Sequence, residues 1–338
     1  MPRRWILGLA AAVAAGTVVA CSSESSAPVD EAAQGQVAEA TTAFVGYDYV
    51  RPEKVEEDSF VSDGDEIVFA VLKIRTTTGV ENSTKWEWVT TSPGATGSTK
   101  AGNEATISDD SGDAWFRDGM AVSPLSAESF SSADGNLHAD VIMTLAFIFE
   151  EDNGITSEDI SILNEIAGRI APRFASVIEG AKIPVSDKTL ENPALLQESM
   201  DALIKQLEAV SLDGAVGDDA VGQLIKRLGS AGFDPNDVIG IAATIFVPTD
   251  DGLIDVMEAC GFPPSKFKLL GPGEGDGNQA WTNYREWYVD KGFIGKVSGE
   301  VWYGLLRSSW VDDWMKVSSN FAWQKEVVYW VKISASMR

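Results

Sequence analysis

The sequence predicts an α+β fold, in which N-terminal and C-terminal strands form an antiparallel or mixed β-sheet body and a three-helix insertion separates them. Residues 67–72 and 238–247 are almost entirely apolar, as strands buried on both faces are. Residues 137–149 place apolar side chains on one face at alternate positions, which is typical of a strand. Residues 156–232 show only helical spacing. This order of strands, helices and strands argues against a regularly alternating parallel fold.

The first strands are predicted from three segments. Residues 44–50 alternate between apolar and polar side chains. Residues 67–76 are apolar on both faces at first and then on one face, so we expect this strand to pass from the centre of a sheet to its surface. Residues 86–89 are a short third candidate, and residues 91–136 are rich in Gly, Ser, Asp and Thr, which indicates long loops with a short strand or two.

The helical segment carries clear start signals. Thr156 precedes acidic residues and an apolar stripe, and Pro172 is expected to kink or split this first helix. Asn192-Pro193 starts a second helix, and a third spans residues 221–228. The stripes of the first two helices consist of Leu163, Ile166, Ile170, Phe174 and Val177, and of Leu196, Met200, Leu203, Leu207 and Val210.

The last third of the chain predicts strands again. A short helix is expected at 253–259, and strands are expected at 301–307 and 327–334. Bulky residues three or four apart predict a short helix at Trp281, Tyr284 and Trp287, and a helical turn at Trp310, Trp314 and Val317. The body therefore consists of a β-rich first half (44–151), the helical insertion (152–232) and a β-rich aromatic second half (233–338).

The first 20 residues have the layout of a signal peptide, because Arg3-Arg4 precede an apolar run that ends in small residues. The segment Val18-Val19-Ala20-Cys21, followed by serines, resembles the lipobox of bacterial lipoproteins. The resemblance implies that the leader 1–20 is removed and that Cys21 receives a lipid. A transmembrane anchor is the alternative, but the apolar run is shorter than the about 20 residues that a spanning helix needs. The residues Arg3-Arg4-Trp5-Ile6-Leu7 also loosely resemble a twin-arginine export signal. We favour the alternative that Arg3 and Arg4 form the ordinary basic region of a signal peptide.

Residues 21–43 are rich in Ser, Ala, Gln and acidic side chains, which predicts a flexible tether between the lipid and the body. The expected location is the outer face of a bacterial membrane, with membrane contact through the lipid on Cys21. The net charge of −25 argues against nucleic-acid binding, and it also repels anionic lipid. Once Cys21 is lipidated, Cys260 is the only thiol, which excludes an intrachain disulfide and a CxxC site.

Two acidic groups are the candidates for a metal site. They consist of Asp109, Asp110 and Asp113, and of Asp250, Asp251 and Asp255. Calcium binds six to eight oxygens, and closely spaced carboxylates in loops supply them. Neither group matches the EF-hand pattern, and such groups also arise by chance in so acidic a chain. No cofactor is evident, and structural calcium is the single candidate.

His138 is the only histidine, so any Ser/His/Asp or Cys/His mechanism would depend on it. Asp140 lies two residues further on, on the same face of the predicted strand, and is the candidate orienting carboxylate. No serine has a Gly-x-Ser-x-Gly context. A surface histidine beside a solvated acid is the favoured interpretation.

The tryptophans gather near the C-terminal end of the sequence. Trp302, Trp314 and Trp330 are candidates for an aromatic platform that binds carbohydrate, whereas burial in a C-terminal core is the favoured alternative.

By function class, we expect a non-catalytic binding or scaffolding lipoprotein of the cell envelope, with a carbohydrate or envelope-protein partner. A solute-binding protein of an uptake system is second, although its two βαβ-rich lobes are not evident. A hydrolase using two carboxylates is third, since 51 acidic residues nominate no particular pair.

Overall fold

The computed structural model describes residues 41–54, 65–90, 98–99, 105–106, 119–150, 156–209, 237–260, 285–289, 293–298, 301–306, 308, 311–321 and 327–338. The predicted leader, Cys21 and most of the predicted tether lie outside this part of the chain.

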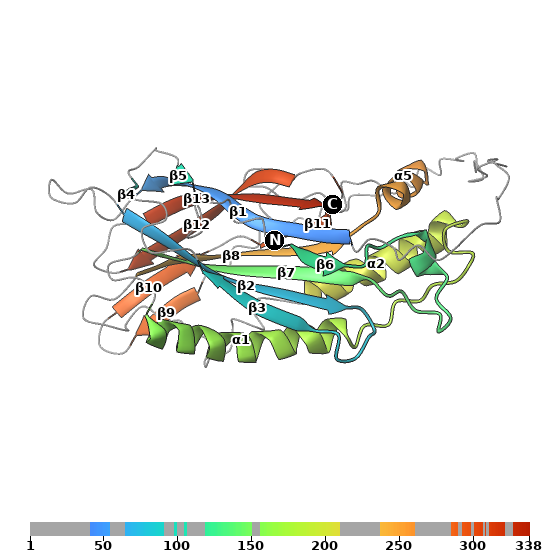
Figure 1. Ribbon diagram of the computed structural model, residues 1–338, viewed down its shortest axis with the longest axis horizontal. Helices are drawn as coiled ribbons and strands as arrows, with labels where there is room; N and C mark the ends of the chain where they lie inside the picture. The colour runs from blue at the N-terminus through green and yellow to red at the C-terminus, as the bar shows by residue number, and fades with distance from the viewer. Residues whose placement is uncertain are drawn as a thin grey trace, which may run out of the picture.

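Three layers make up the described structure, namely two stacked β-sheets and a layer of helices (Figure 1). The outer sheet contains, in spatial order, β5 (Ala105–Thr106), β1 (Thr41–Lys54), β13 (Val327–Met337), β12 (Val311–Phe321), β10 (Phe293–Ser298) and β9 (Arg285–Val289), with β6 (Met120–Val122) also paired to β1. The central sheet contains β11 (Val301–Leu306), β8 (Asp237–Pro248), β7 (Asp140–Glu150), β2 (Asp65–Thr77) and β3 (Lys85–Thr90), with β4 (Ser98–Thr99) also paired to β2. The helices are α1 (Ser157–Ile178), α2 (Pro193–Ala209) and the short α5 (Asp251–Ala259), and η2 (Ala127–Phe130) is a 3-10 turn.

The central sheet is buried on both faces. Along β7, Val141, Met143 and Leu145 pack into the core cluster that includes α1 and α2, whereas Ile142 and Ala146 pack against the outer sheet. The same alternation holds in β2 and β8. This two-sided burial explains why these strands read as continuous apolar runs, and it confirms their predicted central position.

The strand directions confirm the predicted α+β class. Every strand pair in the outer sheet is antiparallel, and in the central sheet β8 and β11 are parallel while β2, β3, β7 and β8 pair antiparallel. The strands β7 and β8 are hydrogen-bonded neighbours, although α1 and α2 lie between them in the sequence. The helices are therefore an insertion between adjacent strands. The predicted third helix at 221–228 lies outside the described residues.

Helix α1 begins at a capping box, in which the Thr156 hydroxyl accepts the Asp159 N–H and the Asp159 carboxylate accepts the Thr156 N–H. The sequence predicted a kink or a split at Pro172, and the helix is not split there, because α1 continues through this residue. Pro172 lies on the exposed face, while Ile170 and Phe174 are buried. Burial of that apolar stripe offsets the roughly 3 kcal/mol that an interior proline costs a helix.

Two predicted helical segments are strands instead. Trp287 lies in β9, and Trp314 and Val317 lie in β12. Strand β12 pairs with β13 from Val311 to Ser319, so a long backbone ladder decides the conformation of this segment. Aromatic residues three apart carry little helical information in segments this short. Trp281, Tyr284 and Trp310 lie outside the described residues.

A polar chain crosses the apolar core between the two sheets. The Tyr47 hydroxyl in β1 lies 3.1 Å from Thr144 Oγ1 in β7 and 3.5 Å from the Ala242 carbonyl oxygen in β8, and Thr144 Oγ1 lies 2.7 Å from Thr244 Oγ1. Burial raises the pKa of the Tyr47 phenol far above its usual value, and the hydrogen bond with Thr144 offsets only part of this rise. The hydroxyl is therefore protonated at neutral pH and joins the two sheets.

We predict that Tyr47→Phe lowers the free energy of unfolding by about 0.5–1.5 kcal/mol, because it removes this buried hydrogen bond and keeps the ring. The measurement is urea denaturation at pH 7. Tyr49→Phe is the matched control, since Tyr49 is only half-buried, and it should change stability by less than about 0.5 kcal/mol. Equal effects of the two substitutions would mean that the hydroxyl does not join the sheets.

Candidate functional site

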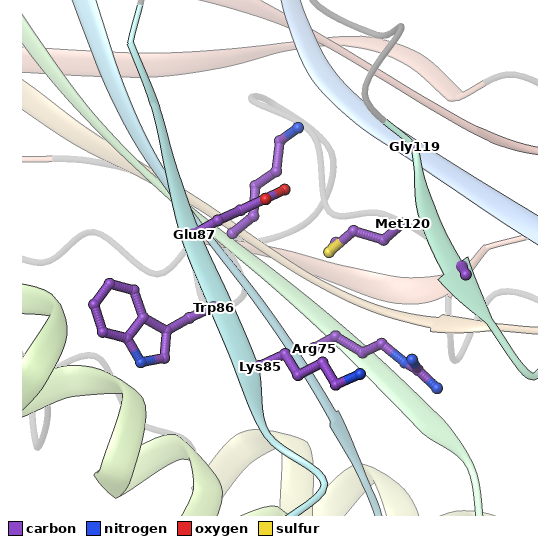
Figure 2. A pocket seen from close by; sticks show the side chains of 8 residues that line it. Arg75, Lys85, Trp86, Glu87, Gly119 and Met120 are labelled. Carbon is purple, nitrogen blue, oxygen red and sulfur yellow. The ribbon is translucent and has the colours of Figure 1, made fainter.

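A cavity of about 280 Å³ opens between β3 at the edge of the central sheet and β6 of the outer sheet. The residues that line it are Lys73 and Arg75 of β2, Lys85, Trp86 and Glu87 of β3, and Gly119, Met120 and Ala121 at β6. Figure 2 shows the Glu87 and Met120 side chains on the two sides of this opening, with Trp86 directed away from it. The cavity lies where the two sheets separate at their edges.

The strand register places the charged side chains on one wall. Lys73 lies opposite Glu87, and Arg75 lies opposite Lys85. Earlier in β2, the side chains of Ile67, Phe69 and Val71 lie on this same face and pack between the two sheets. The face of β2 that is apolar inside the sandwich therefore becomes cationic at its open end.

The prediction that β2 passes from the centre of its sheet to the surface is wrong at Lys73. Its exposed fraction is 2%, so the strand ends in a partly enclosed site and not in bulk solvent. Arg75 remains more accessible, with 26% of its side chain exposed.

Asp140 fixes the position of Arg75. Its carboxylate is 1% exposed, and Oδ2 accepts hydrogen bonds from Arg75 Nε at 3.0 Å and from the Ser123 N–H at 2.7 Å. Arg75 Nη2 lies 2.8 Å from the same oxygen, and Thr77 Oγ1 donates to Oδ1 at 2.6 Å. One buried carboxylate thus joins the end of β2, the start of β7 and the residue that follows β6. It connects the two walls of the cavity.

Glu179 holds the turn that leads into β3. Its carboxylate accepts hydrogen bonds from the Asn82 N–H at 3.0 Å, the Thr84 N–H at 2.9 Å and Thr84 Oγ1 at 2.7 Å. Asn82 has a φ of 59°, a conformation that asparagine adopts more readily than most residues. Burial opposes ionisation of Glu179, but these hydrogen bonds together outweigh it and lower its pKa. The C-terminal end of α1 therefore positions the β2–β3 hairpin.

His138 is not paired with Asp140, the candidate orienting carboxylate. Its Nδ1 lies 2.9 Å from the Thr78 carbonyl oxygen, and its Nε2 lies 3.2 Å from Asp134 Oδ2. Hydrogen bonds from Ser132 and from the Asn136 N–H lower the pKa of the exposed Asp134 to about 2. Asp140 belongs to the cluster around Arg75, so the structure separates the two proposed acid–base residues into different networks.

The second acidic group has structural contacts. Asp250 caps α5, because its Oδ1 accepts the N–H groups of Gly252 and Leu253. Asp251 accepts hydrogen bonds from the Ser308 N–H and hydroxyl. Asp255 is exposed on α5. Within the described residues, no group of three or more His, Cys, Asp or Glu residues could hold a metal ion. Asp109, Asp110 and Asp113 lie outside them.

Of the three candidate platform residues, only the side chain of Trp330 can be placed. It is half-buried, and its Nε1 donates to Glu53 Oε2 at 3.0 Å. The side chains of Trp302 and Trp314 lie outside the described part, although both residues are in strands. Among the described residues, Trp86 is the one tryptophan of the lining, although its side chain is directed away from the opening, and the sequence did not nominate it (Figure 2).

The cationic residues of the cavity were also missed. The available signal was the placement of Lys73 and Arg75 at the end of an apolar strand. Nothing local in the sequence connects them with residues 119–121.

Comparisons with known protein families, with curated proteins and with solved structures found no match for this chain. None of the helices in the described part combines the length and the apolar character needed to cross a bilayer.

We predict that Glu179→Ala lowers the free energy of unfolding at pH 7 by about 1–2 kcal/mol, because backbone N–H groups lose a charged acceptor. The folded-state pKa of Glu179 is lowered, so its contribution is fully present above the usual pKa of 4.5 and is lost as the pH falls through the folded value. When denaturation is measured at a series of pH values from 7 to 3, the free energy of unfolding should therefore fall less steeply in the variant than in the parent.

Glu198→Ala is the control for that experiment, since Glu198 is exposed on α2. It should leave both the stability and its pH dependence close to the parent values. A parent and a Glu179→Ala variant with the same pH profile would contradict the proposed role of Glu179.

Proposed function

We propose that this protein is an exported lipoprotein, held at the outer face of a bacterial membrane by a lipid on Cys21, whose body is a non-catalytic binding or scaffolding domain. The lipobox-like segment supports the anchor. The single observation that carries the binding role is the cavity between β3 and β6, because it combines charged and apolar groups in a concave site.

The chemistry of the lining supports a ligand-binding role. The described residues that line the cavity include lysine, arginine and glutamate side chains, but no serine, threonine, cysteine or histidine. His138 and Cys260 are not among them. The three cations are suited to charge-assisted hydrogen bonds with a ligand.

The walls of the cavity are also held in place before any ligand arrives. Strand β3 is fixed by its ladder to β2 and by Glu179, and β6 is fixed by its ladder to β1 and by the hydrogen bond between Ser123 and Asp140. Preorganisation of this kind reduces the entropy lost on binding. A continuous stack of three layers also favours a rigid binding body over a two-lobed uptake receptor.

The anchor leads to the first test of this proposal. Cys21→Ser should abolish lipid attachment, so the protein should leave the membrane fraction and appear as a soluble or unprocessed species. Fractionation followed by a high-salt wash measures this, with Cys260→Ser as the control that should remain in the membrane. Persistent membrane association of the Cys21→Ser variant would exclude a lipid anchor at this residue.

The cavity leads to the second test. Ala121→Trp should fill the opening, because Ala121 is exposed and lines it on β6. We expect a thermal-shift screen of small anions, cations and neutral molecules to find compounds that raise the Tm of the parent but not of this variant. Ala194→Trp, at an exposed position on α2, is the matched control and should bind like the parent.

The binding role would be wrong if no compound raised the Tm of the parent. It would also be wrong if every active compound raised the Tm of the Ala121→Trp variant equally.

A further inference from the structure

The charge of the cavity is opposite to the charge of the chain. Acidic residues outnumber basic residues by 51 to 26 in the sequence, whereas the described residues of the lining include Lys73, Arg75 and Lys85 and one acid, Glu87. The cationic side chains of this wall attract anions locally, although the surrounding acidic surface repels them.

Lys73 brings a buried lysine side chain to the cavity. Lysine is among the residues least often fully buried, because removing its ammonium group from water costs about several kcal/mol. With an exposed fraction of 2%, Lys73 nevertheless lines the cavity. An ammonium group has three N–H donors, so it can contact neighbouring protein atoms and a ligand at the same time.

Arg75 is oriented for the same task. Asp140 Oδ2 accepts a hydrogen bond from Nε and lies 2.8 Å from Nη2, so it occupies one edge of the guanidinium group. A guanidinium group carries five N–H donors in a fixed plane, so donors remain for a second acceptor. Asp140 also offsets the repulsion among the three cations. It acts as a positioning residue for Arg75.

Lys85 and Glu87 define the remaining charges. Lys85 is exposed and lies opposite Arg75 in the strand register, so these two residues flank the entrance. Glu87 lies opposite Lys73 and would repel a second anionic group. Met120, across the opening on β6, offers an apolar contact (Figure 2).

We propose that the cavity binds a small organic molecule through one carboxylate or phosphate group, which Lys73, Arg75 and Lys85 hold together. The rest of the ligand is uncharged and contacts Met120. This inference rests on the proposed function, because it names the ligand class of the same cavity. The volume of about 280 Å³ is near the lower end for ligand pockets and indicates a small molecule.

The test compares four probes at matched ionic strength and pH 7, namely inorganic phosphate, hexanoate, hexanol and hexylamine. Calorimetric titration uses the full chain in a non-ionic detergent. We expect phosphate or hexanoate to bind the parent, and hexanol and hexylamine to show no binding. Ala121→Trp should abolish the anion binding, because it fills the cavity.

Two charge-reversal variants then locate the anion site. Lys85→Glu should raise the Kd for the bound anion about tenfold, because it places a carboxylate beside Arg75. Lys188→Glu changes the net charge of the chain by the same amount at an exposed turn between α1 and α2, and it should change the Kd less than about twofold.

The outcomes separate the two proposals. If hexanol or hexylamine binds, Ala121→Trp abolishes that binding, and neither anion binds, then the ligand class is wrong while the binding role stands. If Lys85→Glu and Lys188→Glu changed the Kd for the anion equally, the anion would respond only to the net charge of the protein. That result would overturn the inference. Failure of all four probes, together with a negative small-molecule screen, would overturn both.

Discussion

The rest of the structure depends on a central sheet that is buried on both faces. Strands β2, β7 and β8 carry apolar side chains at nearly every position, so one covering layer would leave half of them in water. Burial of apolar surface contributes about 25 cal/mol per Å², which makes that arrangement costly. The outer sheet covers one face and the helices cover the other. The helices enter between β7 and β8, so the same chain supplies a cover without interrupting the hydrogen bonds of those neighbours.

The candidate site is formed where this two-sided burial ends. The inward face of β2 changes from apolar residues to Lys73 and Arg75 beyond the core between the sheets. There the edge strand β3 faces β6, and Asp140 connects both walls. The polar chain from Tyr47 to Thr144 keeps the two sheets in register further inside. The apolar core between the sheets and the charged edge of the cavity therefore lie along the same face of β2.

The sequence pattern predicted most of the fold and little of the site. Two-sided apolar runs identified β2 and β8, and the capping residues identified α1, because both signals are local. The segments around Trp287 and Trp314 were predicted as helical, since their conformation is set by pairing with distant strands. The site depends on the same kind of distant pairing. Adjacency of Arg75 and Lys85 follows from one hairpin, but their approach to Met120 requires β6 to pair with β1 in the other sheet.

The pairing of β1 with β13 has a consequence for how the protein reaches its folded state. Backbone hydrogen bonds join Thr42 and Arg338 in both directions, although the whole central sheet and the helices lie between them in the sequence. Contacts between such distant segments close large loops and slow folding. During synthesis, β1 emerges long before β13 and presents unpaired backbone groups and apolar side chains. The chain therefore depends on being kept from aggregation until β13 has emerged, and its assembly into two sheets is a late, whole-chain event.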